Sequence, residues 1–479
     1  MAVVAAFAVP HPPLIVPEVS PGKEREIPDT VAAYQEVARR IAALRPDAVV
    51  VSSPHAPLYA DYIQISDGPS AQGDFSQFGA RTPRYRVRYD ETLAHEIERQ
   101  GVATGVATGT LGRQDPSLDH GTLIPVHFIE RACAEAGTTS PEYVRLGLSG
   151  LSPLEHYRMG MAVARAAEEL GRSVVYVASG DLSHKLLESG PYGFAPEAPL
   201  FEKQVVDALA TGDFLGLLAI DQDLAERAAE CGLRSFQMMA GALDRTTVDA
   251  ELLSHEGPFG VGYAVAAYSP TGHDPSRDFG EQYRELMMRR SHERRSAEDP
   301  LVALARASIE AWVRDRHTLT GDEVDDLLDE RRTPHPVRAL LDVPRACFVS
   351  LKKHGQLRGC IGTLAPTQAC LSDEIVANAK SASTRDPRFR PVQPDELDDL
   401  VLDVDVLGDP EPVASLDELD PRVYGVIVST EDGRRGVLLP DLAGVDAAEE
   451  QVAIAAQKGA IDAHAEPILL QRFRVERHL

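Results

Sequence analysis

This sequence contains few cysteines, no long hydrophobic run and no excess of basic residues. The five cysteines among 479 residues show no C-x-x-C spacing, so neither a zinc ribbon nor a disulfide framework is indicated. Unpaired thiols fit the reducing cytoplasm, which is the expected location. No apolar run approaches the roughly 20 residues that span a bilayer, and the apolar start lacks the basic residues of a signal peptide. We therefore expect no membrane partner.

The charge balance argues against another class of partner. With 48 basic and 74 acidic residues, the formal net charge is -26, which repels phosphate backbones, so nucleic acid is not an expected partner. The only local basic cluster, residues 289–295, lies in a polar stretch between two predicted domains. There a solvated linker is expected rather than a binding patch.

The first half of the chain alternates between strands and helices. Short β-branched or small apolar runs at residues 3–9, 48–51, 144–148 and 174–178 alternate with helical stretches at residues 30–44 and 153–170. This order favours a mainly parallel sheet with helices on both faces. The sequence therefore predicts an α/β domain over residues 1–271.

Beyond this domain the pattern changes. Residues 272–298 contain few apolar positions and many charges, which predicts a linker. A helix is expected at residues 301–315, and short strands with alternating polarity are expected at residues 346–351, 401–407 and 425–428. This second half, residues 299–479, is predicted to be an α+β domain.

Three strands of the first half are each followed within a few residues by a histidine: His11, His55 and His184. Loops at the carboxyl ends of parallel strands converge on one crevice. A lone histidine is usually structural, but three independent strand-end histidines predict a shared site for one divalent metal. The candidate carboxylate is Glu230, at the end of a helical run, although a glutamate there is more often a surface residue.

Four sequence blocks extend this interpretation: V-P-H-P-P at residues 9–13, S-S-P-H-A at 52–56, D-H-G-T at 119–122 and S-G-D-L-S-H at 179–184. In this order they resemble the class III extradiol dioxygenases, the LigB-like family that opens catechol rings, and its relative the Memo family. The resemblance covers residues 3–268. It implies that His11 and His55 are metal ligands, that His184 is the catalytic acid–base, and that His120 faces substrate and dioxygen.

The resemblance leaves the third metal ligand open. The dioxygenases have a glutamate near the position of Glu230, whereas the Memo relatives have a cysteine beside a glycine, as Cys231 is here. Two histidines and a carboxylate suit iron(II) and leave positions for a catecholate and dioxygen, whereas a thiolate favours copper(I) or zinc. A cysteine ligand would therefore argue against the dioxygenase interpretation. Asp181 would either fix the tautomer of His184 or cap a turn.

The second half contains R-G-C-I-G at residues 358–362, R-D-P-R-F at 385–389 and Y-G-V-I-V at 424–428. These motifs resemble the AMME-syndrome candidate family, whose biochemical role is unassigned. In microbes this family and the Memo-like family commonly occur beside a radical S-adenosylmethionine protein, which makes such a protein an expected partner. Cys360 and Arg358 fit a small anionic ligand site as well as they fit a bend in a strand with a buried cysteine.

The function expected from these observations is an iron(II)-dependent dioxygenase that opens a catechol-like small molecule with dioxygen. The alternative is a Memo-like metal-binding module without oxygenase activity that acts with a radical S-adenosylmethionine protein. Tyr192 and Phe194 are candidate walls of the substrate pocket, although a turn is the default interpretation of residues 190–194. For an enzyme of this size a homodimer is the expected assembly.

Overall fold

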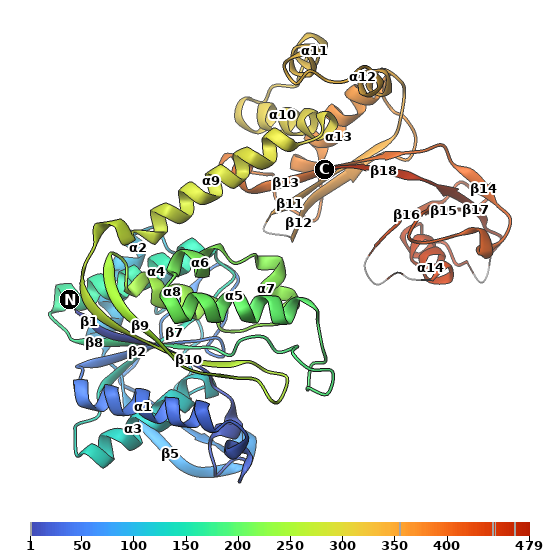
Figure 1. Ribbon diagram of the computed structural model, residues 1–479. Coiled ribbons are helices and arrows are strands. Elements are labelled where there is room, and N and C mark those ends of the chain that lie inside the picture. Colours follow the sequence, from blue (N-terminus) through green and yellow to red (C-terminus); the bar gives the residue numbers. More distant parts are fainter. Residues whose placement is uncertain (1, 354–355, 443–444, 446, 464–465) are drawn as a thin grey trace. The chain divides into compact units, whose positions relative to one another are not determined.

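The computed structural model describes residues 2–353, 356–442, 445, 447–463 and 466–479. The chain divides into two compact units, Met1–Met287 (unit 1) and Met288–Leu479 (unit 2), both drawn in Figure 1. In the part of the chain that is described, no helix is long and apolar enough to cross a bilayer.

Unit 1 is built on one six-stranded sheet (Figure 1). Its strands run in the order β7 (Glu142–Gly147), β2 (Ala48–Ser53), β8 (Val174–Ser179), β1 (Val3–Val9), β10 (Tyr263–His273) and β9 (Thr246–Glu256). The first four strands are parallel, and β10 and β9 extend the sheet as antiparallel strands. The predicted α/β class with a mainly parallel sheet is confirmed.

Both faces of this sheet are covered because β1, β2 and β8 are apolar at almost every position. Successive side chains of a strand point to opposite faces. Phe7, Val49 and Val177 pack on one side against α1 (Pro28–Leu44) and α3 (His120–Ala136). The other side is covered by α2 (Glu91–Ala103), α4 (Pro153–Leu170), α5 (Glu197–Thr211), α6 (Phe214–Ala219), α7 (Gln222–Ala228) and α8 (Leu233–Ala242). Figure 1 shows these two helical layers.

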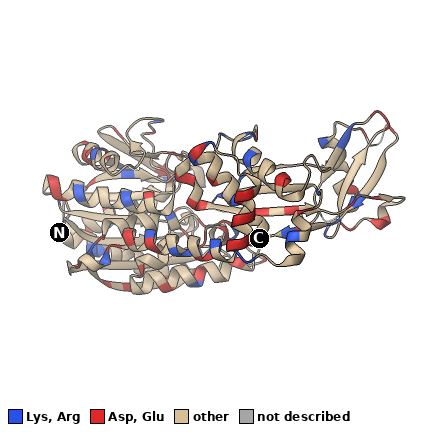
Figure 2. Cartoon of the chain, turned by 90° about the horizontal axis from the view of Figure 1, so that it is seen from above, with Lys and Arg blue, Asp and Glu red and all other residues tan. Residues whose placement is uncertain are grey.

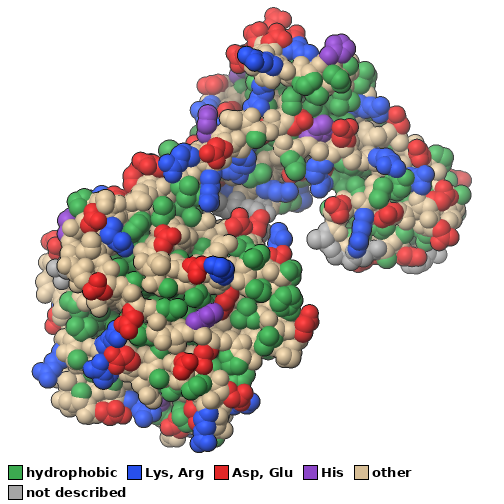
Figure 3. Space-filling model, in the orientation of Figure 1, with side chains coloured by type: hydrophobic (Ala, Val, Ile, Leu, Met, Phe, Trp, Pro, Cys, Tyr) green, Lys and Arg blue, Asp and Glu red, His purple; other side chains and the backbone are tan. Residues whose placement is uncertain are grey.

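Smaller strand pairs lie outside the main sheet. β4 (Ser70–Phe75) and β5 (Ala80–Arg88) form an antiparallel hairpin, and β3 (Ile63–Gln64) pairs with β6 (Thr108–Gly109). On the face of unit 1 that Figure 3 shows, hydrophobic side chains lie interspersed with charged ones.

Unit 2 contains two antiparallel sheets. The first has the order β12 (Gln356–Gly362), β11 (Cys347–Lys353), β13 (Leu400–Leu407), β18 (Val475–His478), and α10 (Pro300–Asp315) and α13 (Leu371–Thr384) share its core. The second has the order β14 (Glu411–Val413), β17 (Leu469–Phe473), β15 (Gly425–Ser429), β16 (Arg435–Leu438) and packs with α14 (Ala448–Lys458). The short helices α11 (Gly321–Glu330) and α12 (His335–Leu341) complete the unit. The predicted α+β class is confirmed.

The segment expected to be a linker has regular structure. β10 continues to His273, and helix α9 (Phe279–Ala297) follows a short 3-10 turn. The helix escaped prediction because it buries only Phe279 and Gly280 and so has no apolar stripe. Its many Arg, Glu and Met residues are nevertheless good helix formers.

Candidate metal centre

Three potential metal ligands from distant parts of unit 1 meet at the carboxyl edge of the sheet. His11 follows β1, His55 follows β2, and Cys231 precedes α8. The Nε2 atoms of His11 and His55 are 3.0 Å apart, and the Sγ atom of Cys231 is 3.6 Å from Nε2 of His11. Each residue thus offers one donor atom, and all three donors lie within 4.8 Å of one another.

The hydrogen bonds of His11 determine which ring nitrogen can bind a metal. The hydroxyl of Ser179 donates to the carbonyl oxygen of Gly121 at 2.6 Å, so its oxygen accepts from Nδ1 of His11 at 3.0 Å. His11 therefore carries its proton on Nδ1, and the lone pair of Nε2 points toward His55. Such support of the second ring nitrogen is typical of histidines that bind metals.

Two of the three donor pairs have the spacing of ligands that share one transition-metal ion. With metal–nitrogen bonds of about 2.1 Å, two nitrogens 3.0 Å apart subtend about 90° at the ion. With a metal–sulfur bond of about 2.3 Å, a sulfur–nitrogen distance of 3.6 Å corresponds to about 110°. Without an ion or a proton between them, two imidazole nitrogens this close would repel each other.

Cys231 reaches the centre because two loop backbones touch. A Cβ atom on Gly180 would overlap the backbone of Gly232, so only a glycine allows the loop after β8 to lie against the start of α8. The backbone N–H of Asp181 then donates to Sγ of Cys231 at 3.3 Å. The Cys-Gly pair in the sequence is the signal for this arrangement.

Glu230, the expected third ligand, is engaged elsewhere. Its carboxylate accepts from the backbone N–H of Leu233 at 2.6 Å and thereby caps the first turn of α8. Among the described residues, the group of potential ligands around His11 and His55 contains Cys231 and not Glu230.

His120 and His184, the expected catalytic residues, lie beside the ligand pair. The ring of His120, the first residue of α3, is 3.9 Å from that of His55 and 5.4 Å from that of His11, measured between centroids. His184 lies near enough to the centre for its charge to interact with those of Asp181 and His55. Its ring stacks on Tyr192 at 5.3 Å.

Asp181 contacts His11, and among the described residues no hydrogen bond joins its side chain to His184. Its Oδ1 atom accepts from the backbone N–H of His11 at 2.8 Å, and its Oδ2 atom is 3.9 Å from Nε2 of His11. The carboxylate therefore holds the loop after β1 in place. Burial raises the pKa of Asp181 to about 6.

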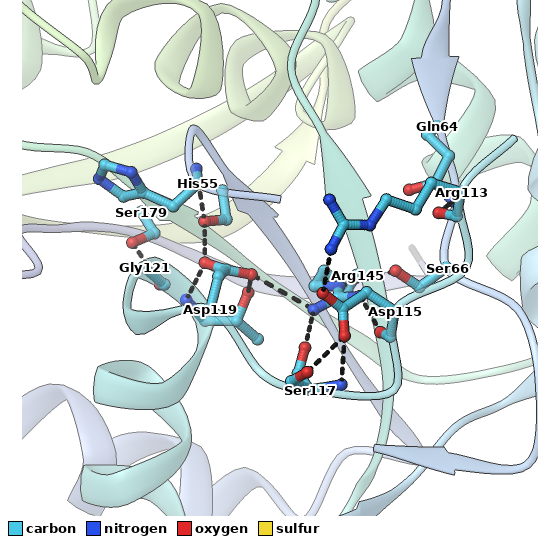
Figure 4. A network of polar contacts seen from close by, with 12 residues as sticks. His55, Gln64, Ser66, Arg113, Asp115, Ser117, Asp119, Gly121, Arg145 and Ser179 are labelled. Atoms are coloured by element: carbon cyan, nitrogen blue, oxygen red, sulfur yellow. Dashed lines mark hydrogen bonds and ion pairs between the residues drawn. The ribbon is translucent and has the colours of Figure 1, made fainter. Parts of the chain in front are cut away.

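A buried arginine supports the His55 side of the centre (Figure 4). Nη1 of Arg145 donates to Asp119 at 3.4 Å, and Asp119 accepts from the hydroxyl of Ser53 at 2.5 Å. Ser53 in turn accepts from the backbone N–H of His55 at 3.2 Å. Asp119 also caps α3 through Thr122 and so positions His120. The sequence motif contained Asp119, but nothing in it indicated Arg145, which lies inside a buried strand.

The environment keeps the imidazoles uncharged at neutral pH. Burial, followed by the charge of His55, lowers the pKa of His11 well below its usual value. The same two causes lower the pKa of His120 to about 3. Burial also lowers the pKa of His184 and raises the pKa of the Cys231 thiol. The histidines are therefore ready to act as neutral ligands, whereas the thiol has to lose its proton when a cation binds.

A cavity of about 610 Å³ opens beside the centre, which is large enough for a small organic molecule. Its wall includes His55 and His120 from the centre, and Gln72, Asp74 and Arg84 from the β4–β5 hairpin. The described lining of this cavity includes neither His184, the expected acid–base, nor Tyr192 and Phe194, the candidate aromatic walls.

In unit 2 the cysteine motif forms part of a strand. Cys360 lies in β12, and its backbone N–H donates to Asp386 at 2.9 Å. Arg358 forms an ion pair with Glu396 at 2.9 Å, and Arg388 forms one with Asp386 at 2.7 Å. Two of the motif arginines therefore already have carboxylate partners. Burial raises the pKa of the Cys360 thiol.

Comparisons with known proteins agree with the division of the chain into two units. Residues 5–266 match the family described as the catalytic LigB subunit of aromatic ring-opening dioxygenase, and residues 302–478 match the AMMECR1 family. Protein CA_C1420 of Clostridium acetobutylicum is 37% identical over 482 residues and covers 98% of both chains. A protein of Thermotoga maritima is 47% identical over 183 residues, which are 38% of this chain and 98% of that protein.

Two solved structures show limited likeness. The uncharacterised protein PH0010 of Pyrococcus horikoshii is 27% identical with a TM-score of 0.32, and the match covers 37% of this chain and 88% of that protein. The uncharacterised protein JW3007 of Escherichia coli is 16% identical with a TM-score of 0.37, and the match covers 55% of this chain and 99% of that protein. The match over residues 5–266 and the full-length relative together show that the chain belongs to the LigB family of aromatic ring-opening dioxygenase subunits, joined in one polypeptide to an AMMECR1 domain.

Proposed function

We propose that unit 1 is a metal-dependent dioxygenase of the ring-opening type, whose iron(II) ion is held by His11, His55 and Cys231. The observation that carries this proposal is the 3.0 Å approach of the two Nε2 atoms at the edge of the parallel sheet. The substrate would be a small catechol-like molecule in the adjoining cavity of about 610 Å³.

A thiolate is softer than the carboxylate expected for iron(II), but the family match over residues 5–266 supports the dioxygenase, and the donor set has the charge that this chemistry needs. Two neutral imidazoles and one thiolate carry the same total charge as two imidazoles and one carboxylate, so Cys231 takes the electrostatic role expected of Glu230. Iron(II) with three protein ligands on one side would supply open positions where a diol and dioxygen meet and exchange electrons. His11 is held for this task by Ser179, and His55 by the Ser53–Asp119–Arg145 chain.

The two remaining histidines would handle protons. A neutral His184 can accept the proton of a substrate hydroxyl and return it to the product, as a general base and then an acid. His120 lines the cavity and is placed to donate a hydrogen bond to substrate. Stacking on Tyr192 fixes the orientation of the His184 ring.

The test separates binding of the metal from turnover. Protein purified without oxygen is assayed for bound metal and then for oxygen uptake with catechols. We expect His11→Ala to lose the metal, and His184→Ala to keep it but turn over about 10²- to 10⁴-fold more slowly. His95→Ala, on the exposed side of α2, is the matched control and should behave as the parent does. Parental turnover in His184→Ala would remove its assigned role.

A second function is favoured by one observation, the sulfur donor. Because a thiolate is a soft ligand, two histidines and a cysteine also suit copper(I) or zinc, and the unit would then be a metal-binding module without oxygenase activity. Copper or zinc in the purified protein, lost in Cys231→Ser, together with no oxygen uptake after iron loading, would support this function against the first.

A further inference from the structure

A second cavity, of about 370 Å³, lies in unit 1 at the edge of the sheet opposite to the metal centre. β10 runs antiparallel to β1, so its end at His273 lies beyond the start of β1 and away from His11. Asp278 follows this end, and Arg245 immediately precedes β9, whose first residue pairs with His273. Both residues line the cavity, which is therefore separate from the proposed substrate site.

Four arginines line this cavity, against two carboxylates. Arg158 and Arg165 project from α4, Arg245 lies before β9, and Arg284 lies on α9. Each carboxylate already has a partner: Asp278 pairs with Arg245, and Glu281 pairs with Arg284. Subtracting the two lining carboxylates from the four lining arginines leaves a formal charge of +2.

The unmatched charge belongs to Arg158 and Arg165. Neither guanidinium makes a hydrogen bond or an ion pair with any residue that the structure describes. Asp244 is not among the lining residues but contacts two of them: it accepts a hydrogen bond from Tyr157 at 2.5 Å and pairs with Arg245 at 3.8 Å. Counting Asp244 as a third carboxylate still leaves a formal charge of +1 beside the four arginines.

An arginine surplus is unexpected on this protein. The chain carries a net charge of -26, and Figure 2 shows Lys and Arg interspersed with Asp and Glu along its elements. The planar fork of donors on an arginine matches the oxygens of a phosphate. Leu154 and Met161, which also line the cavity, offer an apolar surface to the rest of a ligand.

We propose that this cavity binds a small molecule that carries a phosphate or diphosphate group, held by Arg158 and Arg165. The two arginines are seven residues apart on α4, which is about 10 Å along a helix axis, so a diphosphate would engage both more fully than a single phosphate. Binding here would also fix the beginning of α9, because Gly280 and Arg284 belong to that helix.

The experiment is calorimetric titration of the full chain with inorganic phosphate, pyrophosphate and malonate at constant ionic strength. We expect saturable binding in the order pyrophosphate, phosphate, malonate. The double variant R158A/R165A should bind pyrophosphate at least about tenfold more weakly, since it loses charged hydrogen bonds. The exposed Arg131→Ala on α3 should bind as the parent does.

Two further measurements keep the proposal open to refutation. The double variant R158K/R165K keeps the charge but loses the planar fork, and an intermediate affinity is expected if the guanidinium geometry matters. Thermal unfolding of each variant shows whether it is folded. Absence of saturable binding to the parent, tighter binding of malonate than of pyrophosphate, or parental affinity in a folded R158A/R165A would each overturn the proposal.

Discussion

The proton on His11 is set by a single hydroxyl. Because Ser179 donates to the carbonyl of Gly121, it accepts from Nδ1 of His11 and leaves Nε2 free for a metal. Ser179 is buried as the last residue of β8, so its hydroxyl has no access to water. Its role is to orient the ring of His11.

The corresponding prediction concerns the affinity for metal. Ser179→Ala removes the acceptor for Nδ1–H of His11, so we expect metal affinity to fall about 10- to 100-fold, as when other supporting partners of metal ligands are removed. Competition with a chelator of known affinity measures the change. Ser140→Ala, which alters an exposed hydroxyl, should leave the affinity unchanged. Equal affinities for all three proteins would contradict the tautomer assigned to His11.

Helices α4 and α8 touch along their backbones, and this contact places the start of α8 beside the metal centre. A Cβ atom on Gly160 would overlap the carbonyl oxygen of Met238, and one on Gly241 would overlap that of Tyr157. Small residues at such crossings let helix backbones approach closely, and a larger residue forces them apart. Because Cys231 immediately precedes this segment, the spacing of the two helices also determines where its sulfur lies.

For the contact between α4 and α8 we predict that Gly160→Ala destabilises unit 1, although alanine is a better helix former than glycine. The added methyl group has no free space, so we expect a loss of about 3 kcal/mol or more in the free energy of unfolding, as in overpacked cores. Chemical denaturation followed by far-UV circular dichroism measures it. Gly321→Ala is the matched control, because nothing lies within 4 Å of a Cβ there, and it should be neutral. A loss below about 1 kcal/mol in Gly160→Ala would show that the helices can separate.

At the scale of the whole molecule, each unit has its own hydrophobic core. The only tryptophan of the chain, Trp312, lies in α10 of unit 2. Its fluorescence therefore reports unfolding of unit 2, whereas metal binding reports the state of unit 1. This separation allows a change in one unit to be measured in the intact chain.

Through Glu396, we expect the stability of unit 2 to depend on pH. Burial acts to raise the pKa of this carboxyl, but hydrogen bonds from Arg358 and from the backbone of Gln393 outweigh it and lower the pKa from 4.5 to about 2. Because the folded pKa lies below the unfolded one, the stabilisation is present above about pH 4.5 and is lost as the pH falls toward 2.

We therefore expect Glu396→Gln to lower the stability of unit 2 at pH 7 by on the order of 2 kcal/mol, the value of a charged hydrogen bond. The difference from the parent should shrink steadily between about pH 4.5 and pH 2. Urea unfolding followed by Trp312 fluorescence measures both effects. The exposed Glu450→Gln on α14 should show neither. A difference that stayed constant across this pH range would contradict the role assigned to the ionised carboxylate.

Much of this molecule was determined by the sequence alone. Continuous apolar runs such as that of β1 require burial on both faces, which makes the sheet mainly parallel and gathers the loops that carry His11 and His55 at one edge. The same local rules gave α4 its bounds, from a proline at its first position to a glycine after its last. They did not reveal α9, because that helix has almost no buried face.

Tertiary structure alone decided which side chain joins the histidine pair. Glu230 and Cys231 are neighbours in the chain, and the Cys-Gly pair indicated a thiol ligand without excluding the carboxylate. The contact between the backbones of Gly180 and Gly232 brings Cys231, rather than Glu230, next to His11. No sequence pattern indicated that Arg145 is buried next to Asp119 either. Local sequence fixes where a strand ends and which residue follows it. The approach of two distant loops depends on how the helices between them pack, and that is a property of the folded chain.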